Sequence, residues 1–191
     1  RMYEQLSPYS VRARLINLNL LNTNVEQVGS TTVKAILLED EEETAARLGG
    51  SLHEDLFGMT MDSLQTEAAA LTAMFQYMIG NTDWSVVEGR NLRFLNLPGQ
   101  KWIAVPFDFD FCGFVDAPYA TPKSGTGLRN VRERRLMAGE LPAEALDAAA
   151  RKLEENRKAM RDMCTSGLLP ARNARAAAEY LDAFFNEVRG K

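Results

Sequence analysis

The first forty residues show the alternation of apolar and polar positions that is typical of β-strands. Residues 11–20 (VRARLINLNL) follow a period of two with a slip near Ile16, and residues 31–40 (TTVKAILLED) are β-branched at their start and apolar at their end. Residues 22–30 between them are rich in turn formers. The pattern predicts an antiparallel pair of strands or part of a small sheet.

A helical period replaces this alternation further along the chain. The acidic run at 39–50 predicts a short helix that ends at Gly49, because carboxylates are favourable at the positive end of the helix dipole. A longer, apolar helix is predicted to end at Gly80, with Asp62 or Ser63 as its N-cap. Its apolar face, which we expect to pack in a core rather than to bind a cofactor, consists of Leu64, Ala68, Leu71, Phe75 and Met78.

The second half of the chain predicts a hairpin followed by helices. Residues 92–97 and 101–109 are strand candidates separated by a Pro-Gly-Gln turn. Helices are then predicted at 128–139, in one long segment opened by Pro142, and in a final segment after the break at 166–170. The apolar faces of the last two are Leu146, Ala149, Leu153, Met160 and Met163, and Ala174, Ala177, Leu181, Phe184 and Val188.

Composition narrows the candidate chemistry. The 191 residues are 46% hydrophobic, which is enough for a genuine core, and their net charge of −4 gives no general electrostatic reason to bind nucleic acid or an anionic membrane. No apolar run approaches the roughly 18 residues of a membrane span. Two cysteines and one histidine, His53, disfavour a thiolate zinc site and a Ser-His or Cys-His mechanism. His53 itself is expected in a loop or cap. The compartment stays open.

The stretch VPFDFDFCGF, residues 105–114, places Asp108 and Asp110 two positions apart in an otherwise apolar run. On an extended chain both carboxylates point to the same face, where their repulsion is costly unless a cation lies between them. Mg²⁺ or Mn²⁺ is the natural candidate, because hard cations bind carboxylates and often accompany a phosphate. A solvated strand end is the alternative interpretation of these ten residues.

The order of the motifs extends this interpretation. The apolar helix is followed by a loop that contains Asp83 and Asn91, then by the hairpin, and then by Asp108 and Asp110. Because a hairpin brings its two ends together, the loop acid and the strand acids should face one cavity. Phosphotransferases of the protein-kinase superfamily use this arrangement, with a catalytic-loop Asp, an Asn after it, and a metal-binding Asp after the next hairpin.

Three segments carry a resemblance to a known family. FQYMIGNTDWSV (75–86), VPFDFDFCGFVDAPYA (105–120) and VRERR (131–135) together resemble the CotH-type group of bacterial kinase-like proteins, and the GNTD loop more weakly resembles HipA-type kinases. The resemblance covers residues 1 to about 140. It implies an α+β, protein-kinase-like fold, with a small and incomplete β lobe and hinge at 1–50 and a helical C-terminal lobe at 51–191.

The resemblance also implies roles for particular residues. Asp83 would be the catalytic-loop acid, and the metal-binding residues would be Asn91, Asp108 and Asp110. Lys34 is the strand lysine placed to grip a phosphate, and Glu39 lies in the segment similar to the family's hinge, so both are candidate nucleotide-binding residues. The implied activity is transfer of a phosphoryl group from ATP, with Mg²⁺ or Mn²⁺, to a hydroxyl of a protein or small molecule.

The sequence also departs from the pattern of known kinases. Asp83 and Asn91 are eight positions apart, whereas kinases place the pair about five apart. Arg90 stands where the family favours a histidine, and neither 29–35 nor 124–127 is a convincing glycine-rich phosphate loop. Alternative interpretations are therefore a catalytically inactive kinase-like module that binds a nucleotide or metal, and an Asp-x-Asp glycosyltransferase or phosphatase.

Further residues near these motifs have two interpretations. The basic segment RNVRERR (129–135) predicts a solvated amphipathic helix, and its position after the acids makes it a candidate for binding a substrate phosphate. Trp84 and Tyr119 flank the predicted site, and we expect both to pack rather than to recognise a ligand.

Overall fold

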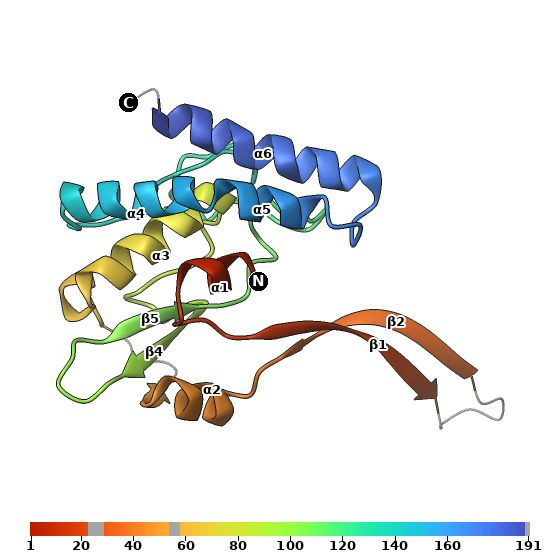
Figure 1. The fold of residues 1–191 in the computed structure, drawn as a ribbon, viewed down its shortest axis with the longest axis horizontal. Helices are drawn as coiled ribbons and strands as arrows, with labels where there is room; N and C mark the ends of the chain where they lie inside the picture. Colours follow the sequence, from red (N-terminus) through yellow and green to blue (C-terminus); the bar gives the residue numbers. More distant parts are fainter. Residues whose placement is uncertain (23–28, 54–57, 190–191) are drawn as a thin grey trace.

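The computed structural model describes residues 1–22, 29–53 and 58–189, and these form an α+β fold with two antiparallel sheets (Figure 1). Helices α4, α5 and α6 lie over α3, and the second sheet lies on the other side of α3. The described elements are α1 (Met2–Leu6), β1 (Ala13–Asn22), β2 (Gly29–Leu38), α2 (Glu41–Leu48), β3 (Ser51–His53), the 3₁₀ turn η1 (Met61–Ser63), α3 (Thr66–Ile79), β4 (Leu92–Asn96), β5 (Ile103–Pro106), α4 (Ala143–Glu155), α5 (Arg157–Cys164) and α6 (Ala171–Arg189).

Strands β1 and β2 form an antiparallel ribbon that extends away from the rest of the molecule (Figure 1). Its register runs from the pair Ala13 and Leu38 to the pair Asn22 and Gly29. The predicted antiparallel pair is therefore confirmed. The predicted turn at 22–30 lies largely outside the described residues, because 23–28 are not described.

The second sheet has the strand order β3-β4-β5 and contains the predicted hairpin. Strand β3, which pairs Leu52 with Leu95, was not predicted, and it carries His53, whose ring lies edge-on to Trp102 at 5.1 Å. The expectation of a loop or cap histidine is therefore wrong. Strand β5 ends at Pro106, three residues earlier than predicted, which changes the backbone that carries the paired acids.

Both predicted helices of the first half are present. Asp40 caps α2 by accepting a hydrogen bond from the backbone N–H of Glu42 at 2.8 Å, and Gly49 ends it in the left-handed conformation. Gly80 ends α3 in the same way.

The predicted N-cap of α3 is wrong. Gln65 fills that position and accepts from the backbone N–H of Ala68 at 2.6 Å. Asp62 and Ser63 lie in η1, because the chain first pairs with Trp102 beside β5: the N–H of Gln65 donates to the Trp102 carbonyl at 2.7 Å.

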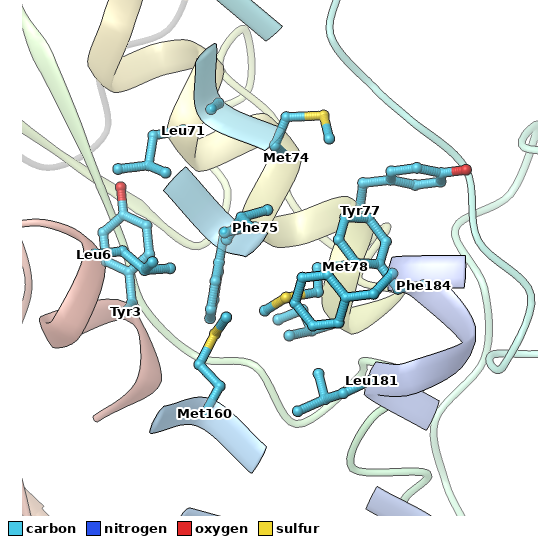
Figure 2. Packing of buried hydrophobic residues seen from close by; sticks show 14 of the residues in the cluster. Tyr3, Leu6, Leu71, Met74, Phe75, Tyr77, Met78, Met160, Leu181 and Phe184 are labelled. Atoms are coloured by element: carbon cyan, nitrogen blue, oxygen red, sulfur yellow. The ribbon is translucent and has the colours of Figure 1, made fainter. Parts of the chain in front are cut away.

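Helix α3 is the centre of the main hydrophobic core (Figure 2). All of its residues from Ala68 to Ile79 are buried. The expectation that its Met and Phe residues pack in a core is confirmed. Figure 2 shows the α3 side chains between α1 and the C-terminal helices. The core residues labelled there are Tyr3, Leu6, Leu71, Met74, Phe75, Tyr77, Met78, Met160, Leu181 and Phe184.

The C-terminal helices differ from the prediction in two places. The segment opened by Pro142 is interrupted at Asn156, so that α4 and α5 are separate helices. The helix predicted at 128–139 is absent, and this segment consists of turns. Local side-chain bonds compete with helix formation there, because Glu133 accepts from the N–H of Arg129 and Asn130 accepts from the N–H of Arg132, both at 3.0 Å. Across the described ranges, no helix is long and apolar enough to cross a membrane.

Candidate functional site

The loop after α3 is positioned by buried polar side chains. The Nδ2 group of Asn81 donates to Oε1 of Gln76 at 2.9 Å, and Oδ1 of Asn81 accepts from the backbone N–H of Asp83 at 2.9 Å. Gln76 and Asn81 are 0% and 1% exposed. Buried hydrogen bonds of this kind hold a backbone in one geometry, so Gln76 and Asn81 fix the backbone conformation at Asp83.

Asp83 and Asn91 are in contact despite their wide spacing. Nδ2 of Asn91 lies 3.0 Å from Oδ2 of Asp83 and 2.6 Å from its carbonyl oxygen. The intervening residues turn back on themselves, because Ser85 and Arg90 exchange two backbone hydrogen bonds of 3.0 and 3.1 Å. This small hairpin absorbs the additional residues of the loop and returns Asn91 to the acid.

Arg90 is the second partner of Asp83. Its Nη1 lies 2.8 Å from Oδ1 of Asp83, and this hydrogen bond raises the pKa of the guanidinium. The same guanidinium approaches Glu88, with Nε 3.9 Å from the carboxylate. The Asp83 carboxylate therefore has a cation on one oxygen and an amide on the other.

The chain then brings the paired acids to this loop. The N–H of Phe107 donates to the carbonyl of Asn91 at 3.2 Å, just beyond the point where Leu92 pairs with Pro106. Asp108 follows with a φ of +52°, and Asn91 has a φ of +54°. Left-handed backbone is uncommon for residues other than glycine and is concentrated at functional sites.

The extended backbone assumed for Asp108 and Asp110 is therefore wrong, although the two carboxyls do interact. Partial loss of hydration raises the pKa of Asp108, and a hydrogen bond to Asp110 and repulsion by it raise that pKa further. Repulsion from Asp83 acts in the same direction. The structure thus brings Asn91 to Asp83 and Asp108 to Asp110, and the bond between Phe107 and Asn91 joins the two segments.

Tyr119 reaches back to these acids. Its hydroxyl donates to Oδ2 of Asp110 at 3.1 Å, and its ring lies 5.6 Å from that of Phe111. This hydrogen bond raises the pKa of the phenol, which is on an exposed side chain. Trp84 is 2% exposed and packs in a hydrophobic cluster with Phe94 and Leu92. The packing expectation is confirmed for Trp84, whereas Tyr119 contacts a predicted metal ligand.

The loop that carries the acids is anchored to the end of α3. The N–H of Phe114 donates to the Ile79 carbonyl at 2.9 Å, and the N–H of Gly113 donates to the Gly80 carbonyl at 3.1 Å. A Cβ at Gly113 would lie 2.5 Å from the hydroxyl of Tyr180, so only glycine permits this approach. The loop of Asp83 and the loop of Asp108 and Asp110 are therefore both attached to the C-terminal end of α3.

The donor set suits a hard cation that is shared with a phosphate. In the described ranges, no group of three or more His, Cys, Asp or Glu side chains is arranged so that it could hold a metal ion. Mg²⁺ is usually bound by one or two carboxylates, with substrate phosphates and water completing its shell. Burial contributes most to the raised pKa of Asp108, and the repulsion by Asp110 that adds to it is what a cation would relieve. Asp108 and Asp110 could therefore supply two oxygen ligands to such an ion, and the amide oxygen of Asn91 is a candidate for a third.

The two candidate nucleotide-binding residues lie apart from these contacts. Lys34 is exposed on the ribbon, where its Nζ donates to Oδ1 of Asn17 at 2.6 Å. Glu39 uses both carboxylate oxygens on Arg47, at 2.7 and 2.6 Å, and this contact lowers its pKa to about 2. Glu39 thus fixes the junction between β2 and α2.

A groove of about 1280 Å³ separates the base of the ribbon from the helices. The junction residues Leu38, Glu39 and Asp40 line one side, and Pro106 and Phe109 line another. Pro106 and Phe109 flank Asp108 in the chain, but Asp83, Asn91, Asp108 and Asp110 are not among the residues that line the groove.

The arginines of the basic segment after the acids contact other parts of the chain. Nε of Arg134 donates to the Met78 carbonyl at 3.1 Å, and its guanidinium lies 3.8 Å from the centre of the Tyr180 ring. Burial lowers the pKa of Arg134. Arg132 pairs with Asp116 at 3.1 Å. The solvated helix is therefore wrong, and a role of these arginines in binding a substrate phosphate stays a prediction.

The sequence analysis missed the supporting residues Gln76 and Asn81 and the ion pair of Arg90. A glutamine inside the apolar run of α3 is the signal that could have indicated a buried polar contact.

Comparison of the chain with protein-family models, with curated proteins and with solved structures finds no match.

Proposed function

We propose that this chain is a kinase-like phosphotransferase that uses ATP with Mg²⁺ or Mn²⁺. The observation that carries the proposal is the hydrogen-bonded pair of Asp83 and Asn91, which joins the backbone at Phe107, next to Asp108. A catalytic acid, an amide and one or two metal-binding acids at the end of a hairpin are the parts that phosphoryl transfer requires.

The reaction assigns one task to each group. The oxygen of a substrate hydroxyl attacks the γ-phosphorus of ATP, the bond to the β,γ-bridging oxygen breaks, and ADP leaves. Asp83 orients the hydroxyl and accepts its proton. Asp108, Asp110 and Asn91 would hold the divalent ion, which supplies positive charge that offsets the charge on the phosphates.

The groove supports a location for the nucleotide. It lies between the β2–α2 junction and the residues Pro106 and Phe109, so the phosphates of a base placed in it would have to extend past the turn of Asp108 to reach the acids. Glu39 contributes by holding the junction through Arg47, whereas Lys34 is bonded to Asn17 on the ribbon and does not line the groove.

The described strands favour this function over the Asp-x-Asp alternatives. Both described sheets are antiparallel, and the acids are followed by turns and three helices. A glycosyltransferase or phosphatase of that kind would be expected to alternate strands and helices around the motif.

Nucleotide binding and phosphoryl transfer can be separated by substitution. We expect ATP with Mg²⁺ or Mn²⁺ to raise the Tm of the wild-type protein, and Asp108→Asn or Asp110→Asn to remove that shift. Asp83→Asn should keep the shift and lower phosphate transfer from radiolabelled ATP to hydroxyl substrates by about 100-fold or more, because general base catalysis contributes this much. Asp62→Asn, an exposed aspartate in η1, is the matched control.

The outcomes distinguish the candidate functions. If no nucleotide raises the Tm of the wild-type protein, both the phosphotransferase and the nucleotide-binding module are wrong. A shift that depends on Asp108 without transfer to any substrate supports the inactive module instead.

A further inference from the structure

Arg90 is held beside the proposed catalytic acid by the backbone rather than by its side chain alone. The two hydrogen bonds between Ser85 and Arg90 close the small hairpin, and Gly89, at a φ of +63°, makes its turn. The loop therefore fixes the backbone of Arg90, and the ion pair with Asp83 holds its guanidinium. Such placement differs from that of a flexible surface arginine, whose ion pairs contribute little to stability.

The guanidinium has hydrogen-bond donors to spare. Nη1 binds Asp83, whereas Nε is 3.9 Å from Glu88, which is too long for a hydrogen bond. Glu88 in turn binds Nζ of Lys123 at 3.0 Å. The Arg90 side chain is 54% exposed, so several of its five N–H groups face solvent.

The carboxylates beside Arg90 are those of Asp83 and Glu88, and Glu88 also binds Lys123. Besides burial and Asp110, repulsion from Asp83 raises the pKa of Asp108, so the charge of Asp83 acts on the paired acids as well. In an in-line transfer, the γ-phosphoryl group lies between the hydroxyl at Asp83 and the ion at the paired acids. A phosphate in that position would lie beside Asp83, the partner of Arg90, and arginine is suited to bind phosphate oxygens through two parallel N–H groups.

We propose that Arg90 binds the terminal phosphate of the nucleotide and so makes the site selective for ATP over ADP. This inference rests on the proposed phosphotransferase function. Asp83 keeps the guanidinium in place before the nucleotide arrives, and the exposed N–H groups then contact the γ-phosphate. Arg90 thereby adds a second positive charge, besides the divalent ion, next to the group that is transferred.

The test compares a nonhydrolysable ATP analogue with ADP, each with Mg²⁺, by calorimetric titration. We expect Arg90→Ala and Arg90→Gln to weaken the ATP analogue by about 10- to 100-fold, as for the loss of a hydrogen bond to a charged group. Binding of ADP should change less than about threefold, because ADP has no γ-phosphate. Arg90→Lys, which keeps the charge but loses the bidentate geometry, should be intermediate.

Control variants separate this inference from the function beneath it. Arg189→Ala removes another exposed, ion-paired arginine and should leave both affinities unchanged. The Arg90 proposal is wrong if the Arg90 variants bind both nucleotides like wild type, or if their affinities for both fall equally. The proposed function stands in that case if Asp108→Asn abolishes binding of both nucleotides. If the wild-type protein binds neither nucleotide, both are wrong.

Discussion

Helix α3 and the β1–β2 ribbon are both rich in apolar residues, but they lie in opposite environments. Every residue of α3 from Ala68 to Ile79 is buried, whereas none of the described residues of β1 and β2 is buried. Leu20 is 51% exposed and Ile36 is 69% exposed. The apolar content of a segment therefore does not show how much it contributes to stability. That contribution depends on whether neighbouring elements bury the segment.

The candidate site belongs to the covered region. Asp83 follows α3, and the acid loop is bonded to the end of the same helix through Gly113 and Phe114. The ribbon joins this region at its base, where Glu39, Arg47 and Arg12 interact. The site is thus built on loops that are anchored to α3 and to the β4–β5 hairpin, and the ribbon contributes to one wall of the groove.

The largest expected effect is a direct test of this contrast. Phe184→Ala should lower the free energy of unfolding by about 3–5 kcal/mol, because the ring is 1% exposed and packs edge-on against Tyr77 and Phe185. Leu20→Ala should change it by less than about 0.5 kcal/mol. Urea unfolding of both variants measures the difference. A cost above about 2 kcal/mol for Leu20→Ala would show that the ribbon is covered in solution.

A smaller effect is expected at the junction of the two regions. Glu39→Gln should cost about 1–3 kcal/mol at pH 7, because it removes the carboxylate that binds Arg47. The pKa of Glu39 is lowered from 4.5 to about 2, so its stabilisation is present above the unfolded pKa and is lost as the pH falls toward 2. The difference between wild type and variant should therefore narrow between pH 5 and pH 2. Glu42→Gln, an exposed control on α2, should show no such narrowing.

The smallest expected effect has the opposite sign and concerns the site. Asp108→Asn should raise the stability of the nucleotide-free protein by a few tenths to about 1 kcal/mol, because it removes repulsion by Asp110 and Asp83. Asparagine also tolerates the left-handed backbone at this position. Thermal unfolding without ligand measures the change. A clear loss of stability would mean that the Asp108 carboxylate has a structural role.

Local signals in the sequence predicted much of the framework and of the candidate site. The helical period of α3, the glycines that end α2 and α3, the β1–β2 pair and the β4–β5 hairpin were all predicted. These features depend on residues close together in the chain. The return of the hairpin to the loop of Asp83 and Asn91 was also predicted, and the bond from the Phe107 N–H to the Asn91 carbonyl agrees with it.

The errors occurred where distant residues decide the conformation. Residues 128–139 have helical amphipathicity, yet Arg134 binds the carbonyls of Met78 near the end of α3 and of Tyr180 in the middle of α6, and short side-chain bonds replace the helix. Strand β3 forms because β4 offers a free edge, and Gln65 caps α3 because Trp102 holds the preceding residues. Such partners cannot be read from the segment itself.

The sequence alone determined which residues carry the candidate chemistry and in which order they occur. The tertiary structure decided how they meet. Asn91 reaches Asp83 because a small hairpin closes between Ser85 and Arg90. Asp108 adopts a left-handed conformation beyond β5, and Arg90 forms an ion pair with Asp83. The physical reason is that backbone period and turn preference act over a few residues, whereas the contacts between charged groups depend on where the folded chain returns.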